Sequence, residues 1–172
     1  MWDIVGPYFE KYPARARVAN ILISYGLSVN KSGDIYCGKV KVSKSAIARA
    51  LKLDKRTVDE TIKMIISEPF LRKIFSNLQP ICNLKFVAST MNGWDVIEIS
   101  VEDTHKPGIL APIAALIAKE GVSIRQVIIG YREGGWEEIV YLITENPIPE
   151  KIFRKIKDIE GVKEVRHLIF NA

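Results

Sequence analysis

Hydrophobic residues in the first half of the chain recur at the spacing of an amphipathic helix. Between residues 14 and 26 they share one helical face, at Val18, Ile21, Leu22 and Tyr25. Ser43 and Asp54 are typical N-cap residues, and each precedes another amphipathic segment. The inward positions of these two helices are Ile47, Ala48, Leu51, Val58, Ile62 and Ile65. Pro69 is expected to end or bend the second helix, and a short helix follows over residues 70–75.

Residues 32–42 have a different pattern. Ser32, Gly33 and Asp34 form a turn signal, and short β-favouring pieces follow around Gly38. These pieces contain Ile35, Cys37, Val40 and Val42. The pattern predicts a small hairpin.

The second half of the chain alternates between strand and helix patterns. Ile97, Ile99 and Val101 alternate with Glu98 and Ser100, which predicts a half-buried strand. Four strands are expected over residues 94–101, 122–131, 136–144 and 162–170, with a hairpin turn at Gly134-Gly135. Helices are expected from residue 107 to 121 and from 149 to 161. This βαββαβ order predicts a ferredoxin-like sheet of four antiparallel strands packed on two helices.

These patterns predict an α+β chain with two domains. Residues 1–80 form a helical domain, residues 81–93 form a boundary rich in turn-forming residues, and residues 94–172 form the ferredoxin-like domain.

Composition favours a folded protein of the cytoplasm. With 48% hydrophobic and 26% charged residues, the chain is unlike a disordered tail or a disulfide scaffold. Two cysteines, Cys37 and Cys82, have no motif spacing and are expected to be reduced. The longest apolar stretch, residues 107–118, is too short to cross a bilayer, and no signal-peptide pattern follows Met1.

Charge is divided unevenly along the chain. Residues 1–90 contain 15 Lys or Arg against 7 Asp or Glu, whereas residues 91–172 contain 10 against 13. A basic half joined to an acidic half indicates that the first part meets a polyanion and the second does not.

Residues 43–58 resemble a helix-turn-helix. Ala48 is small where the second helix must pack closely, Leu53 lies in the turn, and Val58 anchors the second helix to the core. In such a unit the second helix enters the major groove of DNA.

The resemblance implies two sets of DNA-contacting residues. Base edges are expected to face Lys55, Arg56 and Thr57, with Asp59 and Glu60 as further outward candidates. The DNA backbone is expected to meet Lys44, Ser45 and Arg49. The hairpin, with Lys39 and Lys41, is either a winged extension onto the backbone or a plain structural hairpin. The alternative for the whole region is a small helical bundle with solvated cations.

Residues 94–170 resemble the ACT domain, a regulatory module of amino-acid metabolism. The resemblance rests on the strand order, on Lys106-Pro107-Gly108 at the first strand-to-helix turn, and on the helix exit from Glu120 to Ile124. With the preceding helical domain, the whole chain is similar to an archaeal ACT-containing regulator. The resemblance implies pairing of two copies, as a homodimer or higher homo-oligomer, and an amino acid bound near the Pro-Gly turn.

The ACT resemblance also implies a set of ligand-contacting residues: Asp103, His105, Gly108, Ile109, Leu110 and Ser123. A glycine at this turn lets the backbone approach a ligand, and the following helix offers free N–H groups to a carboxylate. Gly108 is equally explained as a turn residue needed only for the fold. The chain departs from the family at His105 and Ser123, where many members have aspartate and asparagine.

Catalytic chemistry is not apparent in the sequence. His105 and His167 have no partners at metal-ligand spacing, and the glycines of residues 130–135 fit a hairpin turn better than a phosphate loop. We therefore expect no enzyme activity, no cofactor and no metal.

The sequence favours a transcriptional regulator of amino-acid metabolism that binds DNA and responds to an amino acid or a related small molecule. Its main alternative is an allosteric partner protein of an amino-acid biosynthetic enzyme that never touches DNA. RNA binding on the four-stranded sheet is a third possibility, disfavoured by the acidity of the second half.

Overall fold

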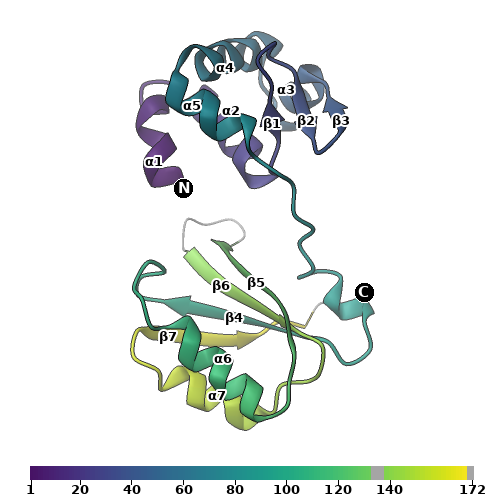
Figure 1. Cartoon of the computed structure of the whole chain (residues 1–172), viewed down its shortest axis with the longest axis vertical. Coiled ribbons are helices and arrows are strands. Elements are labelled where there is room, and N and C mark those ends of the chain that lie inside the picture. Colours follow the sequence, from purple (N-terminus) through teal and green to yellow (C-terminus); the bar gives the residue numbers. More distant parts are fainter. Residues whose placement is uncertain (133–137, 170–172) are drawn as a thin grey trace. The chain divides into compact units, whose positions relative to one another are not determined.

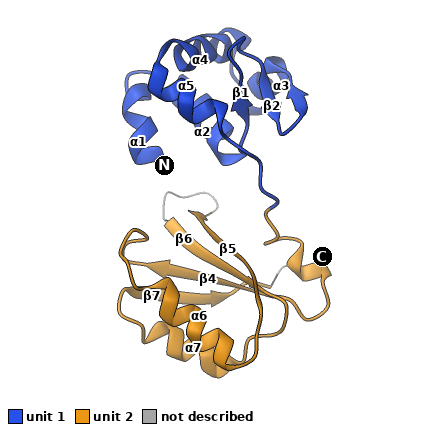
Figure 2. Cartoon of the chain, in the orientation of Figure 1, with its two compact units in different colours: residues 1–82 blue, residues 83–172 orange. Residues whose placement is uncertain are grey.

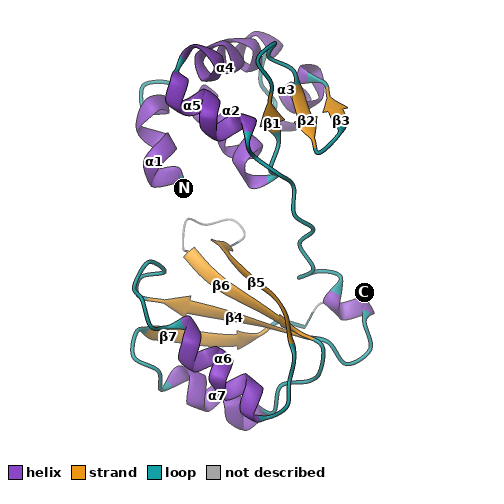
Figure 3. Cartoon of the chain, viewed as in Figure 1, coloured by secondary structure: helices purple, strands orange, loops and turns teal. Residues whose placement is uncertain are grey.

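The computed structural model describes residues 1–132 and 138–169. The chain has a mixed α+β structure with two separate sheets (Figure 3). It divides into two compact units, Met1–Cys82 and Asn83–Ala172 (Figure 2). Within the described ranges, every helix is too short or too polar to span a lipid bilayer.

The first unit is mainly helical, with one small sheet (Figure 1). Its elements are α1 (Trp2–Val5), η1 (Gly6–Phe9), α2 (Pro13–Ser24), β1 (Ser28–Val29), β2 (Ile35–Cys37), β3 (Val40–Val42), α3 (Lys44–Leu51), α4 (Lys55–Ser67) and α5 (Pro69–Ser76). The expected hairpin is present as β2 paired antiparallel with β3. A third strand, β1, pairs with β2 through Ser28–Tyr36 and Val29–Ile35, which the sequence pattern did not predict.

Local capping sets the ends of α3, α4 and α5. The Ser43 hydroxyl accepts a hydrogen bond from the backbone N–H of Ala46 (3.1 Å), and the Asp54 carboxylate accepts one from Arg56 N–H (2.7 Å). Both predicted N-caps are therefore confirmed. Pro69 starts α5, because a proline at the first helical position loses no intrahelical hydrogen bond.

One hydrophobic core holds the first unit together. It joins side chains from η1, the inner faces of α2 to α5, and strands β1 and β2. The largest fully buried members are Phe9, Leu22, Ile35, Ile62, Ile65, Leu71 and Phe75. Because α4 supplies Val58, Ile62 and Ile65 from one face, its opposite face is turned to solvent.

The second unit has the predicted βαββαβ order. Its elements are η2 (Ala88–Thr90), β4 (Asp95–Val101), α6 (Leu110–Lys119), β5 (Ile124–Tyr131), β6 (Glu138–Thr144), α7 (Glu150–Lys157) and β7 (Val162–His167). The strands form an antiparallel sheet of order β5-β6-β4-β7, and α6 and α7 pack on one face of it (Figure 1). The predicted turn at Gly134-Gly135, Trp136 and the predicted strand end at Phe170 lie outside the described residues.

Strand β4 corrects one expectation. The alternating pattern predicts a half-buried strand, but Glu98 and Ser100 on its polar side are only 6% and 2% exposed. The face of the sheet opposite the helices has its own hydrophobic cluster, in which Ala88 packs with residues of β4 and β6. The buried Glu98 carboxylate is paired with Arg132 at 2.9 Å. In β4, the alternation of apolar and polar residues therefore does not mark a solvent-exposed face of the sheet.

Candidate nucleic-acid interface and candidate ligand pocket

A short turn fixes α3 against α4. Ala48 and Val58 are buried where the two helices meet, and Leu53 packs against the core from the turn. Leu53 N–H donates to the Ala48 carbonyl (2.9 Å), and Lys52 has a left-handed backbone (φ 53°) that reverses the chain. Arg17 of α2 donates to the Leu51 carbonyl at the end of α3 (2.6 Å). This hydrogen bond links the end of α3 to α2.

The residues expected to face DNA bases differ in exposure. Arg56 and Lys55 extend from the first turn of α4, with side chains 86% and 61% exposed. Thr57 is only partly exposed, and its carbonyl accepts a hydrogen bond from the Thr61 hydroxyl (2.7 Å). Thr57 therefore lies towards the packed side of α4, away from the most exposed face.

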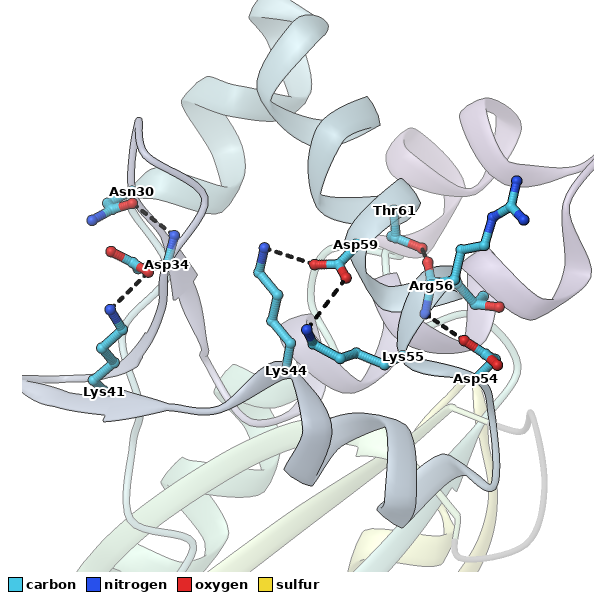
Figure 4. Close-up of polar contacts among 10 residues, drawn as sticks. Asn30, Asp34, Lys41, Lys44, Asp54, Lys55, Arg56, Asp59 and Thr61 are labelled. Carbon is cyan, nitrogen blue, oxygen red and sulfur yellow. Dashed lines mark hydrogen bonds and ion pairs between the residues drawn. The ribbon is translucent and has the colours of Figure 1, made fainter.

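The residues expected to contact the DNA backbone lie on α3. Ser45 and Arg49 are exposed, whereas Lys44 is half-buried. The Lys44 ammonium lies 3.0 Å from the Asp59 carboxylate of α4, and Lys55 lies 3.9 Å from the same carboxylate (Figure 4). The hydrogen bond from Lys44 lowers the pKa of Asp59, with a smaller contribution from the charge of Lys55. Asp59 thus cross-links the two helices and offsets part of their positive charge.

Two cations near this surface were missed by the sequence analysis. Lys63 is exposed and lies seven residues after Arg56, so both are on the solvent face of α4. The seven-residue spacing from Arg56, which is about two helical turns, could have identified Lys63 from the sequence. Arg15 of α2 pairs with Glu60 of α4 at 2.7 Å. No sequence signal connects Arg15 to α4, because the pair is 45 residues apart.

The β2–β3 hairpin adds further lysines to the first unit. Its two-residue turn is Gly38-Lys39, with Gly38 at a positive φ of 58° that favours glycine. At its base, the Asn30 side chain accepts a hydrogen bond from the N–H of Asp34, and Lys41 pairs with Asp34 at 2.8 Å (Figure 4). Asn30 also accepts a hydrogen bond from the N–H of Ser32. The hydrogen bond from Lys41 lowers the pKa of Asp34. Lys39 is exposed at the tip.

The second unit contains an apolar pocket of about 620 Å³ beside the N-terminus of α6. Aliphatic side chains from β4, α6, β5 and β6 line most of it, and residues of the loop before α6 form its edge. The aliphatic lining comprises Val101, Ile109, Leu110, Ala111, Ile113, Ala114, Ile129 and Val140. Such a cavity suits a small ligand that carries a hydrophobic group.

The pocket brings together four of the six residues expected to bind a ligand. His105, Gly108, Ile109 and Leu110 all line it. The other two, Asp103 and Ser123, are exposed and are not among its lining residues. Asp103 instead accepts a hydrogen bond from His105 N–H (2.8 Å) and so shapes the loop.

Gly108 has a conformational role in the same loop. Its φ is +95°, a region that other residues rarely adopt, while a Cβ there would meet no atom of the described residues within 4 Å. Backbone conformation, rather than lack of space, requires glycine at this turn.

Polar groups are concentrated at the edge of this pocket. The His105 ring lies 3.4 Å from Asp103 and 4.0 Å from Glu138, and Thr104 donates a hydrogen bond to Glu138. Lys106 pairs with Glu160 at 3.0 Å, and the hydrogen bond between them raises the pKa of Lys106. Helix α6 starts here without a side-chain cap, and because Pro112 has no N–H, the donors of its first turn are the N–H groups of Leu110 and Ala111. The pocket therefore combines an apolar interior with three polar lining residues, Thr104, His105 and Lys106, each of which contacts an acidic side chain outside the lining.

Comparison with known proteins gives limited similarity. No family model matches the chain. The D-3-phosphoglycerate dehydrogenase of Methanocaldococcus jannaschii is 27% identical over 100 residues, which cover 55% of this chain and 19% of the dehydrogenase. The chain therefore spans about a fifth of the length of this curated relative.

Two solved structures are similar to parts of the chain. The ACT domain from a GTP pyrophosphokinase of Chlorobium tepidum has a TM-score of 0.34 and 23% identity, covering 44% of this chain and 97% of that one. A transcriptional regulatory protein of the AsnC family from Pyrococcus furiosus has a TM-score of 0.25 and 12% identity, covering 74% of this chain and 77% of that one. These scores assign no function to the chain.

Proposed function

We propose that the chain is a ligand-responsive transcriptional regulator whose first unit binds duplex DNA as a helix-turn-helix and whose second unit is an ACT-type sensor. The observation that carries the DNA-binding part is the solvent face of α4, where Arg56 and Lys63 project away from a core that fixes the helix. Their unit contains 14 Lys or Arg against 7 Asp or Glu. An exposed helix of this kind fits the major groove, and surrounding lysines fit phosphates.

Salt-dependent binding tests the DNA-binding proposal. The full chain is titrated with a labelled random-sequence duplex by fluorescence anisotropy, from about 50 mM to about 200 mM salt. Affinity is expected to fall with a log–log slope of about −0.9 for each phosphate contacted. Arg56→Ala and Lys63→Ala should weaken binding, whereas Lys151→Ala, an exposed lysine of α7 in the second unit, should not. Absence of binding at the lowest salt would reject the proposal.

We propose that the effector is an amino acid with an aliphatic or aromatic side chain, or a close analogue. The wall formed by Ile113, Ile129 and Val140 offers nothing to a polar side chain. The N–H groups of Leu110 and Ala111 at the start of α6 suit a carboxylate, and Glu138, which lies behind the lining residues Thr104 and His105, suits an ammonium group. In this proposal the chain senses its ligand and does not transform it.

A thermal-shift screen of the twenty amino acids tests the effector. Ligands that bind only the folded state raise Tm, so leucine, isoleucine, valine or phenylalanine should raise it, and serine and aspartate should not. Ala114→Phe, which places a ring in the pocket, should abolish the shift. A flat screen, or a shift confined to polar amino acids, contradicts this assignment.

An allosteric partner protein that does not bind DNA is the second candidate. The observation that favours it is the pairing of Lys44, Lys55 and Arg56 with Asp59 and Glu60, which reduces the charge available for phosphates. The salt titration separates the two candidates, because the partner protein would leave DNA unbound at every salt concentration.

A further inference from the structure

Two arginines from different helices share one carboxylate on the proposed DNA-reading face. Arg56 donates from Nε to Glu60 Oε1 at 2.9 Å, one helical turn along α4. Arg15 of α2 donates from Nη2 to Glu60 Oε2 at 2.7 Å. Each carboxylate oxygen therefore receives one guanidinium, and Glu60 links α2 to the exposed tip of α4.

This arrangement leaves the outer edge of the Arg56 guanidinium open. Its Nε is engaged by Glu60, and among the described residues its two terminal nitrogens have no hydrogen-bond partner. A guanidinium recognises guanine with two parallel N–H groups that meet O6 and N7. A carboxylate bound at Nε restricts the rotation of the arginine side chain and leaves the N–H groups of its two terminal nitrogens available to a base.

The Glu60 carboxylate is itself held in place by Arg15. Arg15 is only 25% exposed and stacks on the Tyr12 ring, with its guanidinium carbon 4.3 Å from the ring centroid. Hydrogen bonds from Arg56 and, to a smaller extent, from Arg15 lower the pKa of Glu60, so the carboxylate is ionised at neutral pH. The arginine that fixes Glu60 therefore lies on α2, whereas the Arg56 side chain that Glu60 holds lies on α4.

We propose that Arg15 and Glu60 are positioning residues that orient Arg56 to read a guanine in the major groove. This inference rests on the DNA-binding function proposed above. Neither residue needs to touch DNA, and their effect is expected in base selectivity more than in total affinity. Preorganisation acts in this way because an arginine already held in place loses less conformational freedom on binding the correct base.

Asp59 provides a matched control on the same helix. Like Glu60, it pairs with one cation from another helix, Lys44, and with one from α4, Lys55. Its partners are lysines, which act as point charges without a fork. Asp59→Asn and Glu60→Gln change the net charge equally, so both should raise non-specific affinity for DNA to a similar extent.

Selection from a random duplex pool tests the inference with the full-length protein. Arg56→Ala identifies the base pair that Arg56 reads, as the position at which a preference for guanine disappears. Dissociation constants are then measured for the selected duplex and for a copy with 7-deazaguanine at that position. Wild-type protein should discriminate between them by about tenfold. Glu60→Gln should reduce that ratio about threefold or more, Arg15→Met should reduce it less, and Asp59→Asn should preserve it.

Several results would overturn the positioning role. It is overturned if Glu60→Gln retains the wild-type ratio, or if Asp59→Asn reduces the ratio equally. It is also overturned if the change falls on a neighbouring base pair, as it would if Glu60 contacted cytosine directly. Amide NMR spectra of each variant establish that the first unit is folded. If wild-type protein binds no duplex in the pool, the DNA-binding proposal itself fails, which is distinct from binding with unchanged selectivity.

Discussion

Replacing Gly26 with alanine should strongly destabilise the first unit. It follows α2 with a φ of +60°, and a Cβ built there would lie 2.2 Å from the carbonyl oxygen of Gln79 and 2.7 Å from the nitrogen of Pro80. These are backbone atoms, so a rotamer change cannot relieve the overlap. Alanine at this position would combine a left-handed backbone with displacement of residues 79–80.

Gly121 is a matched control for the conformational part of that cost. It follows α6 with a φ of +71°, and within the part of the chain that the structure describes a Cβ there would meet nothing within 4 Å. Gly121→Ala should therefore cost about 1 kcal/mol, the left-handed penalty alone. Gly26→Ala adds the steric overlap and should cost about 3 kcal/mol or more.

Urea denaturation followed by amide NMR signals separates the two units. With an m-value of about 1 kcal/mol/M for units of this size, Gly121→Ala should lower the midpoint of the second unit by about 1 M. Gly26→Ala should lower that of the first by about 3 M, or leave it unfolded. Equal shifts for the two variants would show that residues 79–80 do not approach Gly26 closely, and the reasoning from packing would fail.

Three further predictions concern the core, the acid pairs and the sheet edge. Ile62→Ala should destabilise the first unit by about 2–5 kcal/mol in the same assay, because Ile62 is fully buried, whereas Lys31→Ala on the surface should have little effect. Their basic partners lower the pKa values of Asp59 and Glu60 in the folded protein. The stability that these ion pairs contribute is therefore complete above the usual carboxyl pKa of about 4. It is lost as the pH falls through the lowered pKa values of the folded state. Acid titration of the unfolding midpoint should show this loss, and Asp59→Asn should reduce it. If two copies of the chain pair through edge strand β5, Ile129→Lys should yield monomers in sedimentation analysis, because Ile129 is 56% exposed on that strand. An unchanged mass would exclude β5 as the pairing surface.

Local signals in the sequence predicted most of the helices and strands. Ser43 and Asp54 cap their helices through hydrogen bonds to residues two or three positions ahead, so the sequence nearby contains all the information needed. The same holds for Pro69 at the start of α5 and for the Pro107-Gly108 turn before α6. Strand β1 escaped prediction because its two residues gain their structure only from pairing with β2.

The candidate sites show the same division between local and long-range information. Helical spacing alone placed Arg56 on the exposed face of α4, and the charge of the first half was evident from composition. Only the tertiary structure placed Arg15 beside Glu60, buried Glu98 under Arg132, and left Asp103 and Ser123 outside the pocket lining. Caps, turns and amphipathic faces depend on neighbours within about four residues, which the sequence displays directly. Ion pairs and pocket walls join residues that are distant along the chain, and their geometry exists only once the helices and sheets have packed.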